Sequence, residues 1–159
     1  MLHTIDTRTE YATQQPKDLL GGTVISLQLC PGHRKPMQSR ESVEALTALG
    51  LKGDIHAIEE STRQVLLIDQ ETLQELGLTP GQVKENITTA GIALAQLKQG
   101  QRLRIGTAVL QITKPCSPCS RMDEIRPGLQ DELRGRRGIL ARVLQGGTIR
   151  VGDSIDMLT

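Results

Sequence analysis

Short aliphatic segments separated by glycine and proline run along most of the chain, and this spacing limits the folds that it can adopt. Segments such as TVISLQL (23–29) and RQVLLID (63–69) are rich in Val, Ile and Leu and too short for long helices. Sixteen glycines are available for the turns between them. Several short strands with frequent turn signals predict a mainly β fold, a barrel or a sandwich, with a few short peripheral helices.

The interior of such a fold must be almost entirely aliphatic, because Tyr11 is the single aromatic residue among 159. Proteins that read single-stranded nucleic acid stack bases on aromatic rings, and this chain cannot build such a platform. Its net charge of +1 provides no general attraction to nucleic acid or to a membrane surface. No apolar stretch approaches the roughly 18 residues of a membrane-spanning helix. We therefore expect neither a nucleic-acid nor a membrane partner.

The N-terminal sequence, MLHTIDTRTEYATQQPKDLL, is polar and lacks the pattern of a secretion signal. Three cysteines in a chain without such a signal are typical of a reducing compartment. We therefore expect a cytoplasmic protein with free thiols. A length of 159 residues is close to that of one domain. We expect a polar arm over residues 1–20 and a single domain over residues 21–159.

Three segments are predicted to form short helices. SVEALTALG (42–50) could be capped by its own serine and ended by its glycine. QETLQELG (70–77) follows Asp69, which is a favourable N-cap, and also ends in glycine. PGLQDELRG (127–135) is the third segment.

Two segments in the C-terminal half share one pattern. GQRLRIGTAVLQI (100–112) and GGTIRVGDSIDML (146–158) both place Arg between aliphatic residues, then a glycine, then a second aliphatic run. Each predicts a strand, a tight glycine turn and another strand, which is the pattern of a β-hairpin.

The stretch PCSPC (115–119) carries two thiols, Cys116 and Cys119, just after a predicted strand, where loops often carry function. Its surroundings are rich in Lys and Arg, which favours the thiolate form. Three interpretations are open at this point: a zinc site completed by Cys30 and His33, a thioredoxin-type redox pair, or two ordinary thiols of which one is buried.

Two polar motifs could line a ligand site. In GDIH (53–56), Asp54 and His56 alternate, so that in an extended chain both side chains share a face and the carboxylate can orient the imidazole. In KENITT (84–89), Glu85, Asn86 and Thr88 could bond a polar heterocycle. The alternatives are a local turn for the first motif and a solvated strand end for the second.

A compact guanidinium cluster lies in RGRRG (134–138), between glycines. Arg suits phosphate because its planar fork can bond two oxygens. Arg136 and Arg137 are therefore candidates for an anion site, and a solvated loop is the alternative.

Taken in order, these segments resemble the MOSC domain family, which is named for the C-terminal domain of molybdenum cofactor sulfurase. The resemblance covers roughly residues 23 to 157. It implies a closed, pyruvate-kinase-barrel-like β fold. The segments that carry it are LKGDIHA, RQVLLID, KENITTAGIAL, LKQGQRLRIGTAVLQIT, PCSPC, RGRRGILARVL and GGTIRVGDSI.

The resemblance implies a link to the molybdenum cofactor, which is a molybdopterin that carries a phosphate. The signature cysteine of the family matches Cys119, as a molybdenum ligand or as a persulfide carrier. Cys116 would then resolve a persulfide or be a bystander. The implied pocket includes Asp54, His56 and Asn86. Family descriptions also mention pyridoxal phosphate, which we assign to the sulfurase's separate N-terminal domain.

The leading hypothesis from this resemblance is a molybdenum-dependent oxidoreductase that reduces N-hydroxylated or other N-oxygenated small molecules. The alternatives are a sulfur or cofactor carrier and a zinc-stabilised β binding module. Because the chain shows no flavin or iron–sulfur motif, a separate reductase or sulfur donor is the implied partner.

The chain departs from the family pattern in three ways. Lys84 stands where a glycine usually precedes Glu-Asn, and Ile58 stands where a glycine usually follows the alanine of the GDIHA segment. The molybdenum-holding members also carry an N-terminal barrel domain, which leaves a homodimer as one way to complete the cofactor site.

Overall fold

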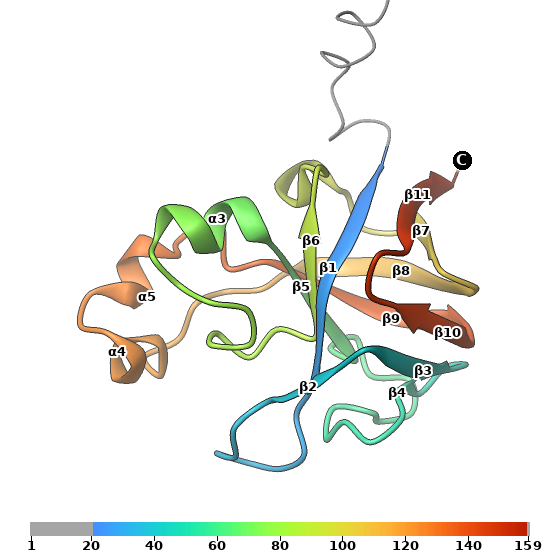
Figure 1. The fold of residues 1–159 in the computed structure, drawn as a ribbon, viewed down its shortest axis with the longest axis horizontal. Coiled ribbons are helices and arrows are strands. Elements are labelled where there is room, and N and C mark those ends of the chain that lie inside the picture. Colours follow the sequence, from blue (N-terminus) through green and yellow to red (C-terminus); the bar gives the residue numbers. More distant parts are fainter. Residues whose placement is uncertain (1–20, 159) are drawn as a thin grey trace, which may run out of the picture.

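The computed structural model describes residues 21–158, and its main element is a β-barrel (Figure 1). Seven strands hydrogen-bond in the order β11-β7-β8-β9-β5-β6-β1, and β1 pairs again with β11, so that the sheet closes. The barrel strands are β1 (Gly22–Leu29), β5 (Val65–Asp69), β6 (Ile87–Ala90), β7 (Arg102–Ile105), β8 (Ala108–Pro115), β9 (Ile139–Gln145) and β11 (Ser154–Leu158).

The barrel encloses an aliphatic core, as the composition requires. Leu27, Leu67, Ile87, Leu103 and Leu110 are fully buried inside it. Burying one side chain of this size contributes about 1.5–3 kcal/mol. The predicted mainly β fold, a closed barrel with a few short helices, is confirmed. The polar arm predicted for residues 1–20 lies outside the described residues, and the single domain over 21–159 stays a prediction.

A smaller sheet covers one end of the barrel. It pairs β10 (Gly147–Arg150), β3 (Ser42–Leu46) and β4 (Gly50–Leu51), while β2 (Gln38–Arg40) pairs antiparallel with β1. The helix predicted over 42–50 is therefore wrong. The buried Val43 and Ala45 alternate with the exposed Ser42 and Glu44, and this period-two alternation suits a strand paired with β10 better than a helix.

The two segments predicted as hairpins differ in their pairing. β7 and β8 form a hairpin, as expected. β10 and β11 follow one another in the same way, yet among the described strands β10 pairs with β3 while β11 pairs with β7 and β1. The turn between them is held by β1 instead, because Val24 N donates to Asp153 O and Gly152 N donates to Val24 O.

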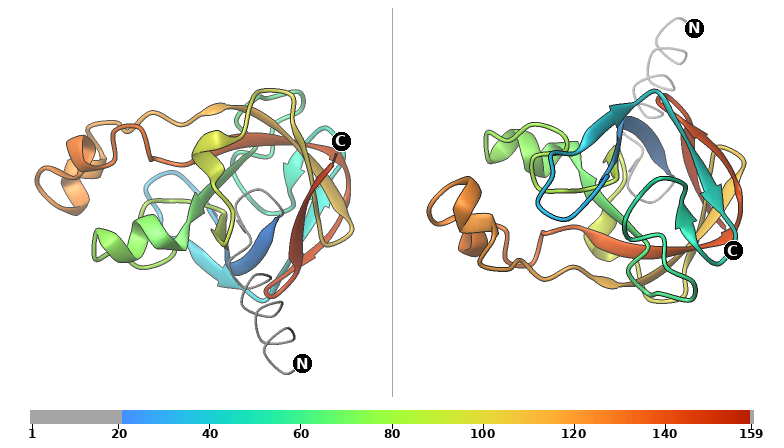
Figure 2. Two further views of the ribbon diagram at one scale, coloured as in Figure 1. Left: turned by 90° about the horizontal axis from the view of Figure 1, so that it is seen from above. Right: turned by 90° about the horizontal axis from the view of Figure 1, so that it is seen from below.

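Short helices lie together beside the barrel in all views (Figure 2). In α3 (Gln70–Glu75), Asp69 caps the N-terminus as predicted, and Gly77 follows with φ 70°. The chain leaves the barrel at the end of β8, forms α4 (Met122–Ile125) and α5 (Leu129–Glu132), and returns at the start of β9. A 3-10 turn, η1 (Leu94–Gln96), precedes β7. None of the helices within residues 21–158 is long and apolar enough to cross a bilayer.

The helices share a second, smaller core with the outer face of β5. It contains Ile68, Leu73, Leu76, Leu78, Val83, Met122, Leu129 and Leu133. This packing fixes the excursion between β8 and β9, which carries both cysteines of PCSPC and all three arginines of RGRRG. The barrel therefore presents these residues on a supported loop.

Candidate functional site

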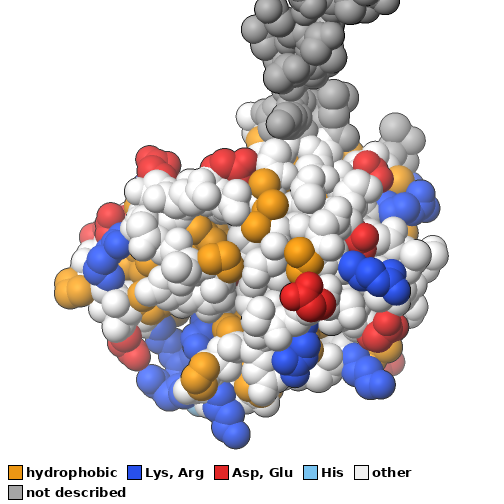
Figure 3. Space-filling view, viewed as in Figure 1, with side chains coloured by type: hydrophobic (Ala, Val, Ile, Leu, Met, Phe, Trp, Pro, Cys, Tyr) orange, Lys and Arg blue, Asp and Glu red, His pale blue; other side chains and the backbone are white. Residues whose placement is uncertain are grey.

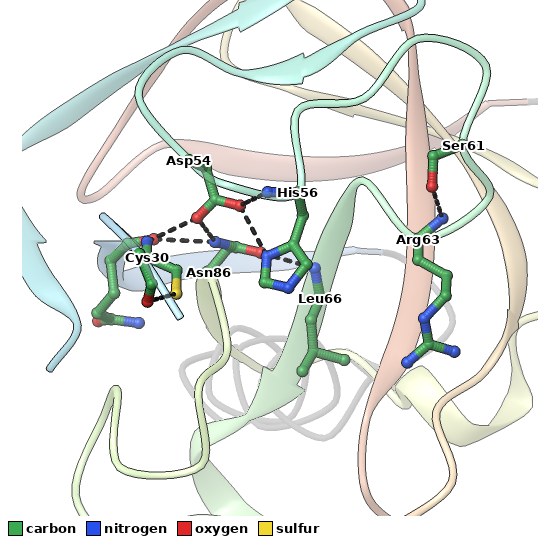
Figure 4. A network of polar contacts seen from close by, with 9 residues as sticks. Cys30, Asp54, His56, Ser61, Arg63, Leu66 and Asn86 are labelled. Carbon is green, nitrogen blue, oxygen red and sulfur yellow. Dashed lines mark hydrogen bonds and ion pairs between the residues drawn. The ribbon is translucent and has the colours of Figure 1, made fainter. Parts of the chain in front are cut away.

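Asp54 is the centre of a polar network at one end of β1 and β5 (Figure 4). Its Oδ1 accepts hydrogen bonds from Cys30 N at 2.6 Å and from Asn86 Nδ2 at 3.0 Å. Its Oδ2 accepts from His56 N and faces His56 Nδ1, both at 2.9 Å. The predicted Asp54–His56 pair is therefore formed, and it is anchored to two further segments of the chain.

The ionised form of Asp54 is stabilised despite its burial. Burial raises the pKa of this carboxyl, but hydrogen bonds from the His56 ring and from the backbone of Cys30 and His56 outweigh it and hold the pKa below its ordinary value. Because a carboxylate only accepts, the bonded Nδ1 of His56 carries a proton. In the neutral imidazole this leaves Nε2 as the acceptor on a side chain that is 47% exposed.

Asn86 joins three segments and uses its side chain inside the protein. Its Nδ2 donates to Gln28 O as well as to Asp54, and its Oδ1 accepts from Leu66 N. Its backbone N–H donates to Leu66 O. Sequence reasoning placed Asn86 against a ligand, whereas these bonds make it the residue that positions Asp54 between β1 and β5.

Glu85 is fully buried next to this network. Its Oε2 accepts from Gly81 N at 2.9 Å and from the Thr88 hydroxyl at 2.8 Å, while Oε1 has no partner among the described residues. Burial raises the pKa of this carboxyl above its ordinary value, and the bonds from Gly81 and Thr88 oppose the rise only in part. Thr88 is itself fully buried, so it positions Glu85 from within the protein.

Arg137 is a buried cation within electrostatic range of Glu85 and of the two thiols of PCSPC. Its side chain is buried, its Nη2 donates to Val83 O at 2.6 Å, and its Nη1 has no partner within residues 21–158. Burial lowers the pKa of this guanidinium, while the electrostatic influence of Cys116, Glu85 and Cys119 opposes that shift. A buried cation therefore lies within electrostatic range of both cysteines, with one N–H group still able to donate.

Arg136 points elsewhere, although it precedes Arg137 directly. Its Nη1 pairs with Glu75 Oε2 at 2.9 Å on α3, and its Nε donates to Glu132 O at 3.0 Å. It borders a different cavity, of about 200 Å³, beside η1 and Asp69. The two arginines that the sequence could not distinguish are thus separated, and Arg137 is the one within electrostatic range of the thiols.

The two cysteines of PCSPC differ in exposure. Cys119 is an exposed free thiol, and its carbonyl accepts from Met122 N at 3.0 Å, so that it starts the turn into α4. Cys116 is buried against Leu66 and Leu140. A cavity of about 240 Å³ lies beside this segment and is lined by Pro115, Cys116, Ser117, Pro118, Gln130 and Gly138, among others.

The proposed zinc ligands do not come together. Cys30 is buried, and its thiol faces Gly32 O, while the exposed His33 ring lies against the Arg121 guanidinium, with Nε2 and Nη2 3.1 Å apart. Within residues 21–158, no three Cys, His, Asp or Glu side chains are grouped to hold a metal ion. All three cysteines are free thiols, so Cys116 and Cys119 are not joined as a disulfide in this structure.

Two glutamines that sequence reasoning missed support the site. Gln28 donates through Nε2 to Glu85 O at 3.0 Å. Gln64 is fully buried: its Nε2 donates to Ala48 O and Ile58 O, and its Oε1 accepts from Val143 N. Gln64 thereby fastens the loop that carries His56. The available signal was a glutamine directly beside aliphatic residues, in TVISLQL and in RQVLLID.

The chain is similar to a known domain family and to several solved structures. The model of the MOSC domain matches residues 52–156. The YUAD protein from Bacillus subtilis is 18% identical, with a TM-score of 0.74 over 87% of this chain and 96% of that one. YiiM from Escherichia coli is 21% identical, with a TM-score of 0.66 over 88% and 70% of the two chains.

YiiM from Geobacillus stearothermophilus is 20% identical, with a TM-score of 0.70 over 87% of this chain and 75% of that chain. At these identities the solved structures show the shared fold alone. No curated protein matches the chain.

Proposed function

The chain belongs to the MOSC domain family, whose members are associated with the molybdenum cofactor, and we propose that it reduces N-hydroxylated or other N-oxygenated small molecules with Cys119 as the molybdenum ligand. One observation carries the proposal: an exposed free thiol stands within electrostatic range of a buried guanidinium that keeps an unpartnered N–H group. Such an arrangement combines an accessible soft sulfur ligand with an anion donor whose charge acts on it.

The residues present fit the cofactor chemically. A thiolate is a soft ligand that suits molybdenum, and the Nη1 group of Arg137 suits a phosphate oxygen or a pterin carbonyl. Glu85 Oε1 is a buried acceptor that suits a ring N–H group. When bound, the cofactor would supply the two-electron reducing chemistry that cleavage of an N–O bond requires.

The Asp54–His56 pair suits the movement of protons. Reduction of an N-hydroxyl group to an amine consumes two electrons and two protons and releases water. His56 holds a proton at Nδ1 against Asp54, and its half-exposed Nε2 can receive a proton from solvent and pass it to substrate. Asp54 keeps the ring in one orientation during that exchange.

The experiment that tests this proposal compares two thiols in one short segment. Protein loaded with cofactor is given an N-hydroxylated base and a chemical reductant, and amine formation is measured. Cys119→Ser should abolish turnover because oxygen is a poor replacement for the soft sulfur ligand. Cys116→Ser should retain most of it, because Cys116 packs against Leu66 and Leu140. Equal activity of the two variants would contradict the assignment.

A second function is favoured by the same exposure of Cys119. A free, solvent-accessible thiolate can take the outer sulfur of a donor persulfide, whose own thiolate leaves, and hand that sulfur on; the buried Cys116 is a second thiol in the same segment. Mass spectrometry of protein incubated with a sulfur donor would then show the mass of one added sulfur on Cys119. Absence of that adduct, together with turnover of an N-hydroxylated substrate, would rule out the carrier function and support the reductase function.

A further inference from the structure

A group of basic side chains lies beside the Cys119 segment, and we call Arg34, Lys35, Lys84 and Arg121 the basic rim. Blue side chains gather at the lower left of the space-filling view, over the loop that joins β1 to β2 (Figure 3). That loop and β2, CPGHRKPMQSR (30–40), contain no acidic residue. In a chain of net charge +1, this is a local excess of positive charge.

Contacts bring the four residues together from three parts of the sequence. Lys84 Nζ donates to Lys35 O at 3.1 Å, and Arg121 Nη2 lies 3.1 Å from His33 Nε2. Arg121 is two residues beyond Cys119 in the sequence. The carbonyl of Cys119 accepts a hydrogen bond from the backbone N–H of Met122, the residue that follows Arg121. The rim therefore borders the segment that holds the exposed thiol.

The rim cations are less neutralised than other arginines nearby. Arg34 pairs with Glu124 at 3.2 Å, on side chains that are both more than half exposed. Lys35, Lys84 and Arg121 have no carboxylate partner among the described residues. By contrast, three other arginines of this region form ion pairs with carboxylates: Arg126 with Glu132, Arg134 with Asp131, and Arg136 with Glu75.

Two residues of the basic rim have strained backbone conformations. Arg34 has φ 61° and Lys84 has φ 69°, in the left-handed region that disfavours residues with a Cβ. Lys84 is also the position at which the family usually has glycine, the residue that adopts such an angle freely. A lysine here is strained where a glycine would not be, which suggests that its ammonium group has a use.

We propose that the basic rim is the docking surface for an acidic electron-donor protein that carries a flavin, an inference that rests on the proposed reductase function. The chain contains no flavin or iron–sulfur motif, so the two electrons for each N–O bond must arrive from outside. Two electrons pass from the reduced flavin, two protons come from the flavin and solvent, and the products are oxidised flavin, amine and water. Complementary charge steers such brief encounters, which bury little area.

The placement of the cations fits a protein surface better than a small anion. Lys35, Lys84 and Arg34 are exposed on the outside of a loop and a turn, on long side chains. A phosphate site would bring several donors to one enclosed point. Spread-out, solvent-exposed cations instead act through the summed field over a surface, which is what recognition of an acidic protein face needs.

Binding can be tested without cofactor or turnover. The isotope-labelled protein is titrated at low salt with a flavodoxin, a small acidic FMN protein, and NMR shift changes are recorded. We expect saturable changes at residues 33–35, 84 and 121, and their loss at high salt. Lys84→Glu should weaken the affinity about tenfold, whereas Lys98→Glu, with the same change of net charge outside the rim, should not.

A second substitution at position 84 serves as the control for folding. Lys84→Gly removes the charge and the strain together, so it should unfold at a temperature no lower than the wild type and still bind flavodoxin more weakly. Absence of saturable shifts in the wild type at low salt would overturn the proposal, as would equal affinity of the Lys84→Glu and Lys98→Glu variants. Stoichiometric binding of inorganic phosphate at the same residues would overturn it in favour of a small-anion site.

A kinetic comparison separates this inference from the proposed function. With reduced flavodoxin as donor, Lys84→Glu should turn over substrate more slowly than the wild type, and the difference should shrink as salt rises. With a chemical reductant, the two proteins should be equal. No turnover of the wild type with the chemical reductant would defeat the reductase function, while the NMR titration would still decide the docking surface.

Discussion

The carboxylate of Asp54 accepts two hydrogen bonds from His56, one from its backbone N–H and one from its ring Nδ1, both at 2.9 Å. These two bonds fix the orientation of a half-exposed imidazole. The two residues are separated by one position, so a short loop is enough to create the contact. The same carboxylate also accepts from Cys30 N and from Asn86 Nδ2. Disturbing Asp54 should therefore affect both the imidazole and the junction of three segments.

Asp54→Asn should lower both stability and activity. The amide replaces one of the two carboxylate oxygens by an NH₂ group, so the donors that bond this oxygen in the wild type lose their acceptor. Leaving a buried donor without an acceptor costs about 1–3 kcal/mol. Urea unfolding measures this loss. The ring-nitrogen chemical shifts of His56 should be those of one tautomer in the wild type and those of a mixture of tautomers in the variant. His56→Ala is the matched control, because it removes a half-exposed ring and should leave the stability nearly unchanged. If both variants unfold alike, Asp54 is not the structural junction described above.

Glu85 should make the protein less stable as pH rises. Its folded-state pKa is raised above the ordinary 4.5 by burial, so the folded protein holds this proton more tightly than the unfolded chain. Stability is then lost as pH rises from that ordinary value through the raised one. Asp54 has the opposite sign: its depressed pKa contributes stability above 3.8, which is lost as pH falls through the lower folded value.

Free energies of unfolding against pH check both signs. Glu85→Gln should remove the decline above 4.5 while keeping the hydrogen bonds from Gly81 and Thr88, because the amide retains an acceptor oxygen. A wild type and a Glu85→Gln variant with parallel pH curves in that range would show that the buried carboxyl does not titrate as described.

Arg137 and Arg136 should respond differently to the same substitution. Arg137→Leu removes the unpartnered Nη1 and the buried cation near Glu85 and the thiols, so pterin content after loading should fall strongly. Arg136→Leu breaks an ion pair with Glu75 that is partly exposed, which is worth about 0–1 kcal/mol, and it should leave pterin content unchanged. Equal loss in the two variants would argue against a specific role for Arg137.

Lys84 allows a direct test of backbone strain. At φ 69°, a residue with a Cβ is disfavoured by about 1–2 kcal/mol, and the entropy of glycine in the unfolded chain offsets part of that. Lys84→Gly should therefore be more stable than Lys84→Ala by about 0.5–1 kcal/mol, since both variants lose the charge and only the first loses the strain. Chemical denaturation measures the difference; a more stable alanine variant would contradict the left-handed geometry.

Local patterns predicted most of the fold. The apolar runs of β1 and β5, the Asp69 cap and the glycine that ends α3 were all correct, because each depends on neighbours in sequence. Residues 42–50 were misread as a helix because capping signals outweighed the alternation of Val43 and Ala45. The partners of β10 and β11 are set by β3 and β1, which lie far away in sequence, so local signals could not supply them.

The site was only partly predictable, for the same reason. Asp54 and His56 are close because a turn of two residues brings them together. Asn86 reaches Asp54 across 32 positions, and nothing local marks it as a supporting residue. The contrast between the exposed Cys119 and the buried Cys116 depends on how the excursion from β8 packs on the barrel, and no spacing rule for the two thiols contains that information.

The most direct test of the central claim is the molybdenum and pterin content of protein loaded with cofactor, measured together for the wild type, Cys119→Ser and Cys116→Ser. The account predicts molybdenum and pterin in equal amounts in the wild type and in Cys116→Ser. Cys119→Ser should lose most of its molybdenum. A wild type that takes up neither, or a Cys119→Ser variant that holds molybdenum as well as the wild type does, would contradict the assignment of Cys119 as the metal ligand.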